Sequence, residues 1–215
     1  MKGGRLMQDV RQVCGLIGAK RRAGSRLVVG IAGPPASGKS TLAEAVVSHI
    51  NMADGKTGAA LLPMDGYHLD NGLLGARGLL DRKGAPETFD SRGFCNAVLG
   101  LQATDREIFF PSFDRARDIA IANSICIGPD VDVVVVEGNY LLLQSDPWAG
   151  LREAFAITVF LSPGLEILKG RLQSRWIEHG LDPQAALDRV TGNDLPNAEL
   201  VLANSGPADV VLDQR

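Results

Sequence analysis

The segment with the clearest chemical meaning spans residues 33–41 and reads G-P-P-A-S-G-K-S-T. It fits the phosphate-binding pattern G-x-x-x-x-G-K-[ST] in full. In this pattern Gly33 and Gly38 let backbone N–H groups form a concave anion nest, and the N-terminus of the next helix adds positive potential. We predict that Lys39 reaches the β- and γ-phosphates of a nucleoside triphosphate and that the Ser40 hydroxyl binds Mg²⁺. The predicted nucleotide-binding residues are Gly33, Pro34, Pro35, Ala36, Ser37, Gly38, Lys39, Ser40 and Thr41.

A carboxylate follows the second apolar stretch of the chain. Residues 59–64 are apolar enough for a buried strand, and Asp65 stands directly after them. At the C-terminal end of a strand, opposite a phosphate loop, a carboxylate can accept the proton of a substrate hydroxyl. Asp-Gly is also a common turn pair, so a carboxylate that caps a helix or a turn is an equal alternative. Position alone leaves both interpretations open.

Glu137 follows the strongest strand signal of the chain, residues 131–136. An acid at the end of a buried strand in a P-loop protein commonly holds Mg²⁺ or its water shell. The alternative is a carboxylate at a solvated strand end.

Arg171 and Arg175 stand four residues apart and therefore share one face of a predicted helix. Arginines that close over a nucleotide stabilise the charge of the transferred phosphoryl group. A solvated helix face is the alternative for this pair. His68 has two readings as well: it binds substrate or tunes Asp65, or it is simply hydrogen-bonded within its loop.

The pattern of apolar residues predicts an α/β protein. Strands alternate with helices, which favours parallel pairing through right-handed crossovers and ligands at the C-terminal strand edges. The stretch 66–93 has no clean period, and a loop of that length is often functional. Strands are expected at 26–32, 59–64, 107–110, 131–136, 155–161 and 209–212, with a hairpin arm at 117–127. Helices are expected at 5–19, 39–50, 94–103, 148–154, 164–179 and 183–203, the last broken or kinked at Pro196.

Composition excludes several classes of protein. The chain has 215 residues, which suits one domain, and its 45% hydrophobic content argues against disorder. A net charge of −3 does not favour a nucleic-acid partner. We find no apolar run long enough for membrane insertion and no secretion signal. Three widely spaced cysteines form no metal-type cluster and are expected as reduced thiols, which favours the cytoplasm; they are Cys14, Cys95 and Cys126.

Several segments together resemble the P-loop small-molecule kinases that include uridine kinase, phosphoribulokinase and bacterial pantothenate kinase. The chain looks most similar to the kinase-like proteins associated with bacterial fructose transport systems. The segments, which run through most of the chain, are residues 33–41, M-D-G-Y-H-L-D-N (64–71), R-K-G-A-P-E-T-F-D (82–90), F-D-R-A-R-D-I-A (113–120), V-E-G-N-Y-L-L-L (136–143) and N-D-L-P-N-A (193–198).

The resemblance implies a P-loop NTPase three-layer sandwich with a mostly parallel five-stranded sheet and a helical lid. Residues 1–215 would form a single P-loop kinase domain, with an N-terminal helix within 1–24, an acceptor-site insertion at 66–93 and a lid at about 169–182. ATP and Mg²⁺ are the implied cofactors. The implied catalytic residues are Asp65 as the base, Lys39, Arg171 and Arg175, with Ser40 and Glu137 at the metal. Residues implied to line the acceptor pocket are Tyr67, His68, Arg115, Asn139 and Tyr140.

The chain departs from the uridine kinase pattern at residues 113–117, which read F-D-R-A-R and are strongly basic. This departure speaks against a nucleoside acceptor. A pocket with Arg115 and with Arg82 or Lys83 favours an acceptor that is anionic or rich in hydroxyl groups.

We therefore expect transfer of the γ-phosphoryl group of ATP to a hydroxyl of a small molecule, a carbohydrate, by a monomer or homodimer. The alternative is a nucleotide-binding regulatory NTPase or switch without an acceptor. Guanine-reading switches usually carry an Asn-Lys-x-Asp segment, and this sequence has none.

Overall fold

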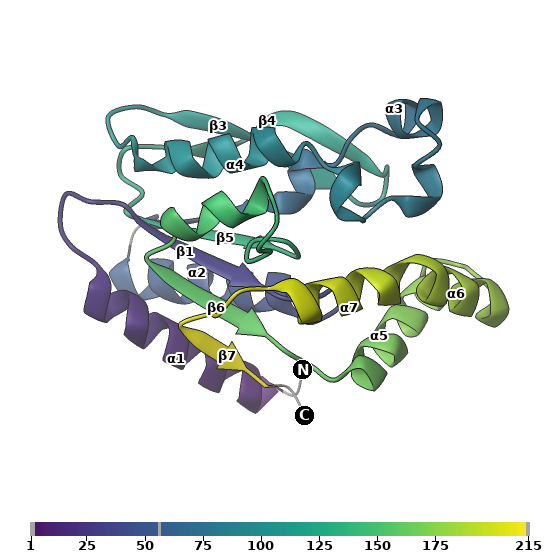
Figure 1. Ribbon diagram of the computed structural model, residues 1–215. Coiled ribbons are helices and arrows are strands. Elements are labelled where there is room, and N and C mark those ends of the chain that lie inside the picture. Colours follow the sequence, from purple (N-terminus) through teal and green to yellow (C-terminus); the bar gives the residue numbers. More distant parts are fainter. Residues whose placement is uncertain (1–2, 56, 214–215) are drawn as a thin grey trace.

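Five parallel strands form the central sheet, in the spatial order β2-β5-β1-β6-β7 (Figure 1). The computed structural model describes residues 3–55 and 57–213. All residues of β1, β5 and β6 are buried, because helices cover both faces of a parallel sheet. This explains why these strands are apolar except at Glu137 and Thr158. The predicted α/β fold with a five-stranded sheet is confirmed. The strands are β1 (Leu27–Ala32), β2 (Ala59–Pro63), β5 (Val133–Gly138), β6 (Ile157–Leu161) and β7 (Val210–Leu212).

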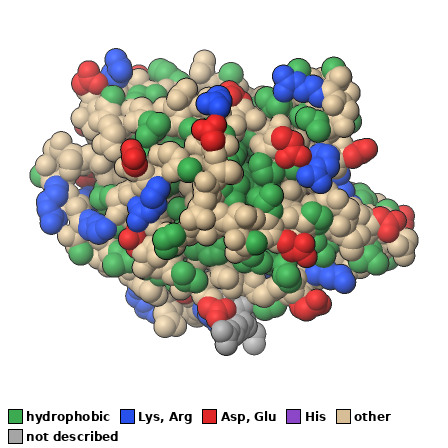
Figure 2. Space-filling model, viewed as in Figure 1, with side chains coloured by type: hydrophobic (Ala, Val, Ile, Leu, Met, Phe, Trp, Pro, Cys, Tyr) green, Lys and Arg blue, Asp and Glu red, His purple; other side chains and the backbone are tan. Residues whose placement is uncertain are grey.

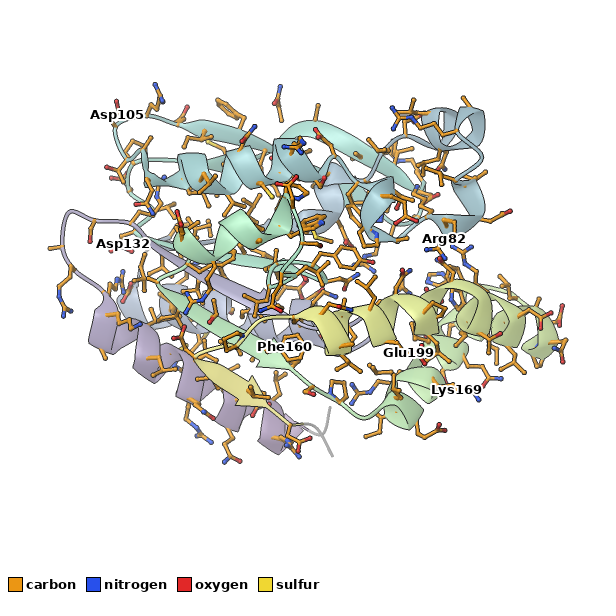
Figure 3. The ribbon with its side chains drawn as sticks, viewed as in Figure 1. Arg82, Asp105, Asp132, Phe160, Lys169 and Glu199 are labelled. Atoms are coloured by element: carbon orange, nitrogen blue, oxygen red, sulfur yellow. The ribbon has the colours of Figure 1, made fainter. Side chains whose placement is uncertain are left out.

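Two hydrophobic clusters flank the sheet, one on each face. Side chains alternate along a strand, so Val133 and Val135 of β5 join one cluster while Val134 and Val136 join the other. The helices α1 (Gly3–Lys20) and α2 (Lys39–Asp54) cover the first face. The helices α4 (Ser91–Leu99) and α7 (Leu195–Asn204) lie over the second, where Phe160 of β6 packs (Figure 3).

The C-terminal segment differs from the sequence prediction in where its helix breaks. The chain forms α5 (Leu165–Glu178) and α6 (Pro183–Arg189), and then a π-helical stretch, Val190–Asp194, leads into α7. Pro196 therefore lies in the first turn of α7, where the missing N–H leaves no intrahelical hydrogen bond unmade. The helices α5 and α6 extend beyond the strand ends in Figure 1.

A second, two-stranded sheet stands above the helices of the second face (Figure 1). The strands β3 (Ile108–Asp114) and β4 (Ile119–Ile127) pair antiparallel as the β3–β4 hairpin, with a register shift between Phe110 and Ser112. The first strand is longer than predicted and passes through Pro111, which that shift accommodates. The carbonyl oxygen of Pro111 lies so near Gly66 that a Cβ there would be only 2.2 Å away. Only glycine fits this contact, which holds the hairpin beside Asp65.

The long stretch 66–93 folds into short helical pieces. It contains the short helix α3 (Asn71–Ala76) and runs into the start of α4 at Ser91. The Asp70 carboxylate caps α3 and accepts from the Gly72 N–H. The stretch shows no single period in the sequence because short 3₁₀ segments interrupt it, at Met64–Tyr67, Leu80–Arg82 and Pro86–Thr88. Two more 3₁₀ segments lie elsewhere in the chain, at Gly100–Gln102 and Trp148–Glu153. Charged side chains of both signs are interspersed over the face shown in Figure 2. Among the described residues, no helix is long and apolar enough to cross a membrane.

Candidate active site

The predicted phosphate loop connects β1 to α2, as the motif requires. The N–H of Ser37 donates to the Pro34 carbonyl at 3.1 Å and closes the loop. Gly38 adopts a left-handed backbone with φ of 91°, which glycine adopts without steric cost. A Cβ on Gly33 would lie 2.8 Å from the Ser37 hydroxyl and 2.9 Å from the Leu161 carbonyl, so the close turn also needs glycine. The strand–loop–helix context is therefore present in full.

Glu137 lies between the ends of β1 and β2, opposite Ile31 and Pro63 in the sheet register. Its side chain is 3% exposed, so the alternative of a solvated strand end is wrong. Burial raises the pKa of Glu137, and the positive charge of Lys39 opposes this effect. Burial likewise lowers the pKa of Lys39, which the charges of Glu137 and Asp65 counteract. The lysine and the glutamate therefore stabilise each other's charged forms at the end of the sheet.

The oxygens around Glu137 fit a magnesium ion. Its Oε2 atom is buried and has no hydrogen-bond partner among the described residues. The nearby Ser40 hydroxyl acts on the same carboxylate and lowers its pKa, against the larger effect of burial. The described residues contain no cluster of three or more metal-ligating side chains. Mg²⁺ usually keeps several waters and takes only one or two protein oxygens together with phosphates, so this sparse donor set suits it.

Asp65 follows β2 in the first 3₁₀ turn, and its carboxylate meets an arginine of the β3–β4 hairpin. Arg115 Nη2 lies 2.6 Å from Asp65 Oδ2. The side chain of Asp65 makes no helix-capping hydrogen bond in that turn. The geometry thus supports the interpretation as a charged group of the site over that of a cap.

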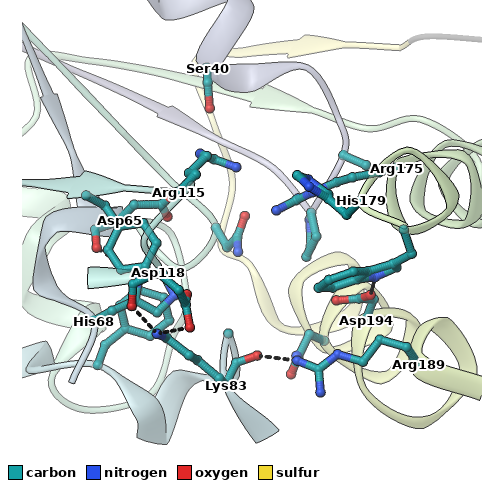
Figure 4. Close-up of a pocket in the computed structure, with 18 of the residues that line it drawn as sticks. Ser40, Asp65, His68, Lys83, Arg115, Asp118, Arg175, His179, Arg189 and Asp194 are labelled. Atoms are coloured by element: carbon teal, nitrogen blue, oxygen red, sulfur yellow. Dashed lines mark hydrogen bonds and ion pairs between the residues drawn. The ribbon is translucent and has the colours of Figure 1, made fainter. Parts of the chain in front are cut away.

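A cavity of about 710 Å³ brings most of the predicted residues together (Figure 4). The phosphate loop and the start of α2 form one wall. The turn after β2 and the β3–β4 hairpin form a second, and the helices α5 to α7 form a third. Predicted residues that line the cavity are Pro35, Ala36, Gly38, Lys39, Ser40, Thr41, Asp65, His68, Lys83, Arg115, Asn139 and Arg175.

The two arginines of α5 are half-buried and not simply solvated. Arg171 Nη1 donates to the carbonyls of Ala36 at 3.2 Å and Ser37 at 3.3 Å, so it ties α5 to the phosphate loop. Arg175 lines the cavity, where burial and the nearby charge of Arg115 lower its pKa. The first arginine lies outside the cavity wall, and the second faces into the cavity.

His68 is stacked between two phenylalanines, with ring centroids 4.0 Å from Phe89 and 4.6 Å from Phe113. Its Nδ1 atom lies 2.8 Å from the Asp65 carbonyl oxygen. A carbonyl oxygen only accepts, so Nδ1 donates and the neutral ring keeps Nε2 as an acceptor. Burial lowers the pKa of His68 and favours this neutral form. His68 is therefore hydrogen-bonded within its loop and also lines the cavity, and its contact with a substrate stays a prediction.

Three residues predicted for the acceptor pocket lie away from the cavity. Tyr67 packs edge-on against Phe94 at 5.1 Å between ring centroids. Tyr140 is fully buried and donates to the Gly84 carbonyl. Arg82, labelled in Figure 3, pairs with Glu87 at 3.2 Å. The acceptor side therefore contains His68, Lys83, Arg115 and Asn139 from the original set, and the Oδ1 atom of Asn139 is buried without a partner among the described residues.

Sequence reasoning missed several cavity residues. Asp118 ends the hairpin turn and accepts a hydrogen bond from Asn71. A second group, on the lid side, consists of Trp176, Arg189 and Asp194. Trp176 Nε1 donates to Asp194 Oδ2 at 2.5 Å, and the Arg189 guanidinium lies over the indole ring. Segments 113–120 and 193–198 had been singled out by resemblance, and that was the only signal that pointed to Asp118 and Asp194.

Comparisons with known proteins agree with this geometry. A proposed uridine kinase of Schizosaccharomyces pombe is 34% identical over 199 residues, which cover 88% of this chain and 83% of that protein. A pantothenate kinase of Corynebacterium diphtheriae is 30% identical over 139 residues, 65% of this chain and 45% of the relative. The crystal structure of a proposed fructose transport system kinase from Silicibacter sp. TM1040 superposes with a TM-score of 0.87 at 41% identity, covering 94% of this chain and 98% of the other.

No protein-family model matches the chain. The phosphate loop, the parallel sheet and the similarity to a relative over most of both lengths nevertheless point the same way. The chain therefore belongs to the P-loop small-molecule kinases, the family that includes uridine kinase and bacterial pantothenate kinase.

Proposed function

We propose that this small-molecule kinase transfers the γ-phosphoryl group of ATP to a hydroxyl group of a carbohydrate, with Mg²⁺ as its metal. The observation that carries this proposal is that the Asp65 carboxylate lines the same cavity as Lys39, Ser40 and the rest of the phosphate loop. Residues 1–215 act in this proposal as one domain, with 66–93 on the acceptor side and the arginines of α5 as the lid.

The phosphate end of the site binds the nucleotide. Backbone N–H groups of residues 33–41 surround the phosphates, and Lys39 places its ammonium beside them. Ser40 and Glu137 would hold Mg²⁺, which neutralises charge on the β- and γ-phosphate oxygens when bound. The unpartnered Oε2 atom of Glu137 supports this assignment.

Asp65 acts as the base in this proposal. Its carboxylate accepts the proton of the acceptor hydroxyl as that oxygen attacks the γ-phosphorus, and the bond to the leaving β-phosphate oxygen breaks. The ion pair between Arg115 Nη2 and Asp65 Oδ2, at 2.6 Å, holds the carboxylate in place beside the cavity. A general base contributes about 10²–10⁴-fold to the rate.

The lid arginines supply positive charge and exclude water. Arg175 faces the cavity and would contact the transferred phosphoryl group. Arg171 contacts the carbonyls of Ala36 and Ser37, so we assign it to holding the phosphate loop and the lid together. Phosphoryl transfer depends mainly on positioning and electrostatics, which this arrangement provides.

The class of acceptor rests on the side chains opposite the phosphate loop and on one comparison. Lysine, arginine, histidine and amide groups line that side, a set that suits a molecule rich in hydroxyls. The similarity at 41% identity to a proposed fructose transport system kinase supports a carbohydrate. The basic hairpin turn at Arg115 and Arg117 remains an argument against a nucleoside.

The test is acceptor-stimulated ADP formation. The purified chain is incubated with MgATP and with single sugars, polyols, nucleosides or pantothenate, and ADP is measured against a control without acceptor. We expect one class of carbohydrate to raise ADP formation well above the control. If no acceptor does so, and if GTP binds more tightly than ATP, the chain is a nucleotide switch and the proposal fails.

A further inference from the structure

A closed network of polar contacts occupies the acceptor side of the cavity. We call its three members, Asn71, Lys83 and Asp118, the Lys83 cluster. Lys83 Nζ donates to Asn71 Oδ1 at 2.6 Å and to the Asp118 carbonyl at 3.1 Å, and it pairs with Asp118 Oδ2 at 2.9 Å. Asn71 Nδ2 donates to Asp118 Oδ2 at 2.8 Å. The cluster joins the start of α3 to the tip of the β3–β4 hairpin, and all three residues line the cavity. Figure 4 shows Lys83 and Asp118.

The two positive charges that the stretch 66–93 and the β3–β4 hairpin bring to the cavity are already compensated. Lys83 is paired with Asp118, and Arg115 is paired with Asp65. Arg189 belongs to the lid side, where it donates to the carbonyls of Asp81 and Lys83 and is in no ion pair with a described residue. An anionic acceptor would therefore find no unpaired cation on the wall that carries Lys83 and Arg115.

The phosphate side differs. Among the residues that the structure describes, neither Lys39 nor Arg175 has a carboxylate within ion-pair distance. Burial is the largest cause that lowers the pKa of each, and Arg115 contributes to both effects. Unpaired positive charge therefore lies along the phosphate loop and the lid, at Lys39, Arg175 and Arg189, whereas the wall that carries Lys83 and Arg115 is balanced in charge.

The same side presents hydrogen-bonding groups to hydroxyls. The Asp118 side chain keeps 52% of its surface exposed, so the carboxylate has acceptor capacity beyond its two partners. His68 is a neutral acceptor at Nε2, and its stacking on Phe89 and Phe113 forms an apolar wall. A concave site with an apolar wall and a few polar groups is typical for small ligands.

We propose that the acceptor is an uncharged polyol; this inference rests on the kinase function proposed above. Asp118 and Asn71 bind the hydroxyl groups of the polyol. Asp118 is also the residue that rejects anionic acceptors. Rejection follows because a negative acceptor would meet the Asp118 carboxylate while Lys83 is already neutralised by it.

The experiment compares neutral acceptors with their anionic counterparts. D-fructose is tested against D-fructose 6-phosphate, and glycerol against D-glycerate, by kcat/KM for ADP formation with MgATP. We expect the neutral member of the preferred pair to exceed the anionic one by about tenfold or more, the size of one charged hydrogen bond. In the Asp118→Asn variant Lys83 is no longer neutralised, so this ratio falls by about tenfold or more while the KM for ATP stays unchanged.

A matched control removes the same charge from the other end of the same turn. Asp114 pairs with Arg117 at 2.7 Å and does not line the cavity, so Asp114→Asn keeps the wild-type preference. A wild-type preference for anionic acceptors overturns the inference and leaves the kinase function standing. An unchanged ratio in Asp118→Asn overturns the role of Asp118.

Binding is measured separately, so that the two proposals fail in different ways. Melting temperatures are recorded with a non-hydrolysable ATP analogue and each acceptor, because a bound ligand stabilises the folded protein. If no acceptor is phosphorylated but neutral polyols stabilise the wild type and not Asp118→Asn, the polyol site stands and the kinase function fails. If neutral polyols give neither turnover nor stabilisation, the inference is overturned together with the carbohydrate kinase function.

Discussion

Replacing Asp65 with asparagine tests the proposed chemistry at one atom. Asparagine has nearly the same shape as aspartate and can still accept a hydrogen bond from Arg115, but it cannot take a proton from the acceptor hydroxyl. We expect kcat to fall by about 10²–10⁴-fold, which corresponds to about 3–5 kcal/mol of transition-state stabilisation. The KM for ATP should not rise, because the substitution removes a negative charge from the cavity that binds the triphosphate.

The expected loss of folding stability is much smaller than the loss of activity. Arg115 is 53% exposed in its pair with Asp65, and pairs of this kind contribute about 0–1 kcal/mol. For a chain of this size such a change shifts the melting temperature by at most about 4 °C. The two magnitudes differ enough that unfolding cannot account for a large loss of kcat.

The assay is acceptor-stimulated ADP formation, with melting temperature and binding of an ATP analogue measured on the same preparations. Asp146→Asn is the matched control, because it breaks an equally short ion pair, Arg92 to Asp146 at 2.7 Å, in which both side chains are largely exposed. The control should retain wild-type kcat. A fall in kcat of less than tenfold in a folded, ATP-binding Asp65→Asn protein would refute the role of this carboxylate as base.

Three further substitutions test other parts of the structure. Glu137→Gln removes the proposed metal carboxylate, so half-maximal activity should need on the order of tenfold more Mg²⁺ or higher, as measured by titrating Mg²⁺ at fixed ATP. Gly66→Ala places a methyl group 2.2 Å from the Pro111 carbonyl oxygen and should lower the free energy of unfolding, measured in denaturant, by about 1–3 kcal/mol. Its control is Gly75→Ala in α3, which has open space around it and should change this free energy by about 1 kcal/mol or less. Equal losses in both variants would contradict the packing argument. Burial raises the pKa of Tyr67 from 10.0 to about 12, so the protonated phenol stabilises the fold fully below pH 10 and this contribution is lost as pH rises from 10 to 12. Stability of Tyr67→Phe should therefore decline less steeply than that of the wild type between pH 10 and 12, and identical curves would disprove the assignment.

Parts of the site that are contiguous in sequence were predictable. The phosphate loop is a single run between a strand and a helix, so its motif carries its geometry with it. The end of β5 was recognisable because four successive valines precede Glu137. The burial of Glu137 depends on neighbours from β1 and β2, and the sequence alone left a solvated carboxylate as an alternative.

Side-chain direction in the irregular segments was not predictable. Tyr67 and His68 are adjacent, yet the first packs against Phe94 and the second lines the cavity. A 3₁₀ turn rotates each successive residue by about a third of a turn, and the surroundings decide which of them meets solvent. Arg82 and Lys83 divide in the same way, since only Lys83 reaches the cavity.

The amino-acid sequence by itself determined the class of fold, the phosphate loop and the strand ends that carry acidic groups. These features follow from local rules: period of apolar residues, left-handed glycines and the order of elements along the chain. Tertiary structure alone decided which charges are compensated, because Asp118 meets Lys83 across 35 residues and Arg115 meets Asp65 across 50. Such pairs form only when the hairpin folds back over the sheet, and no local pattern encodes that approach.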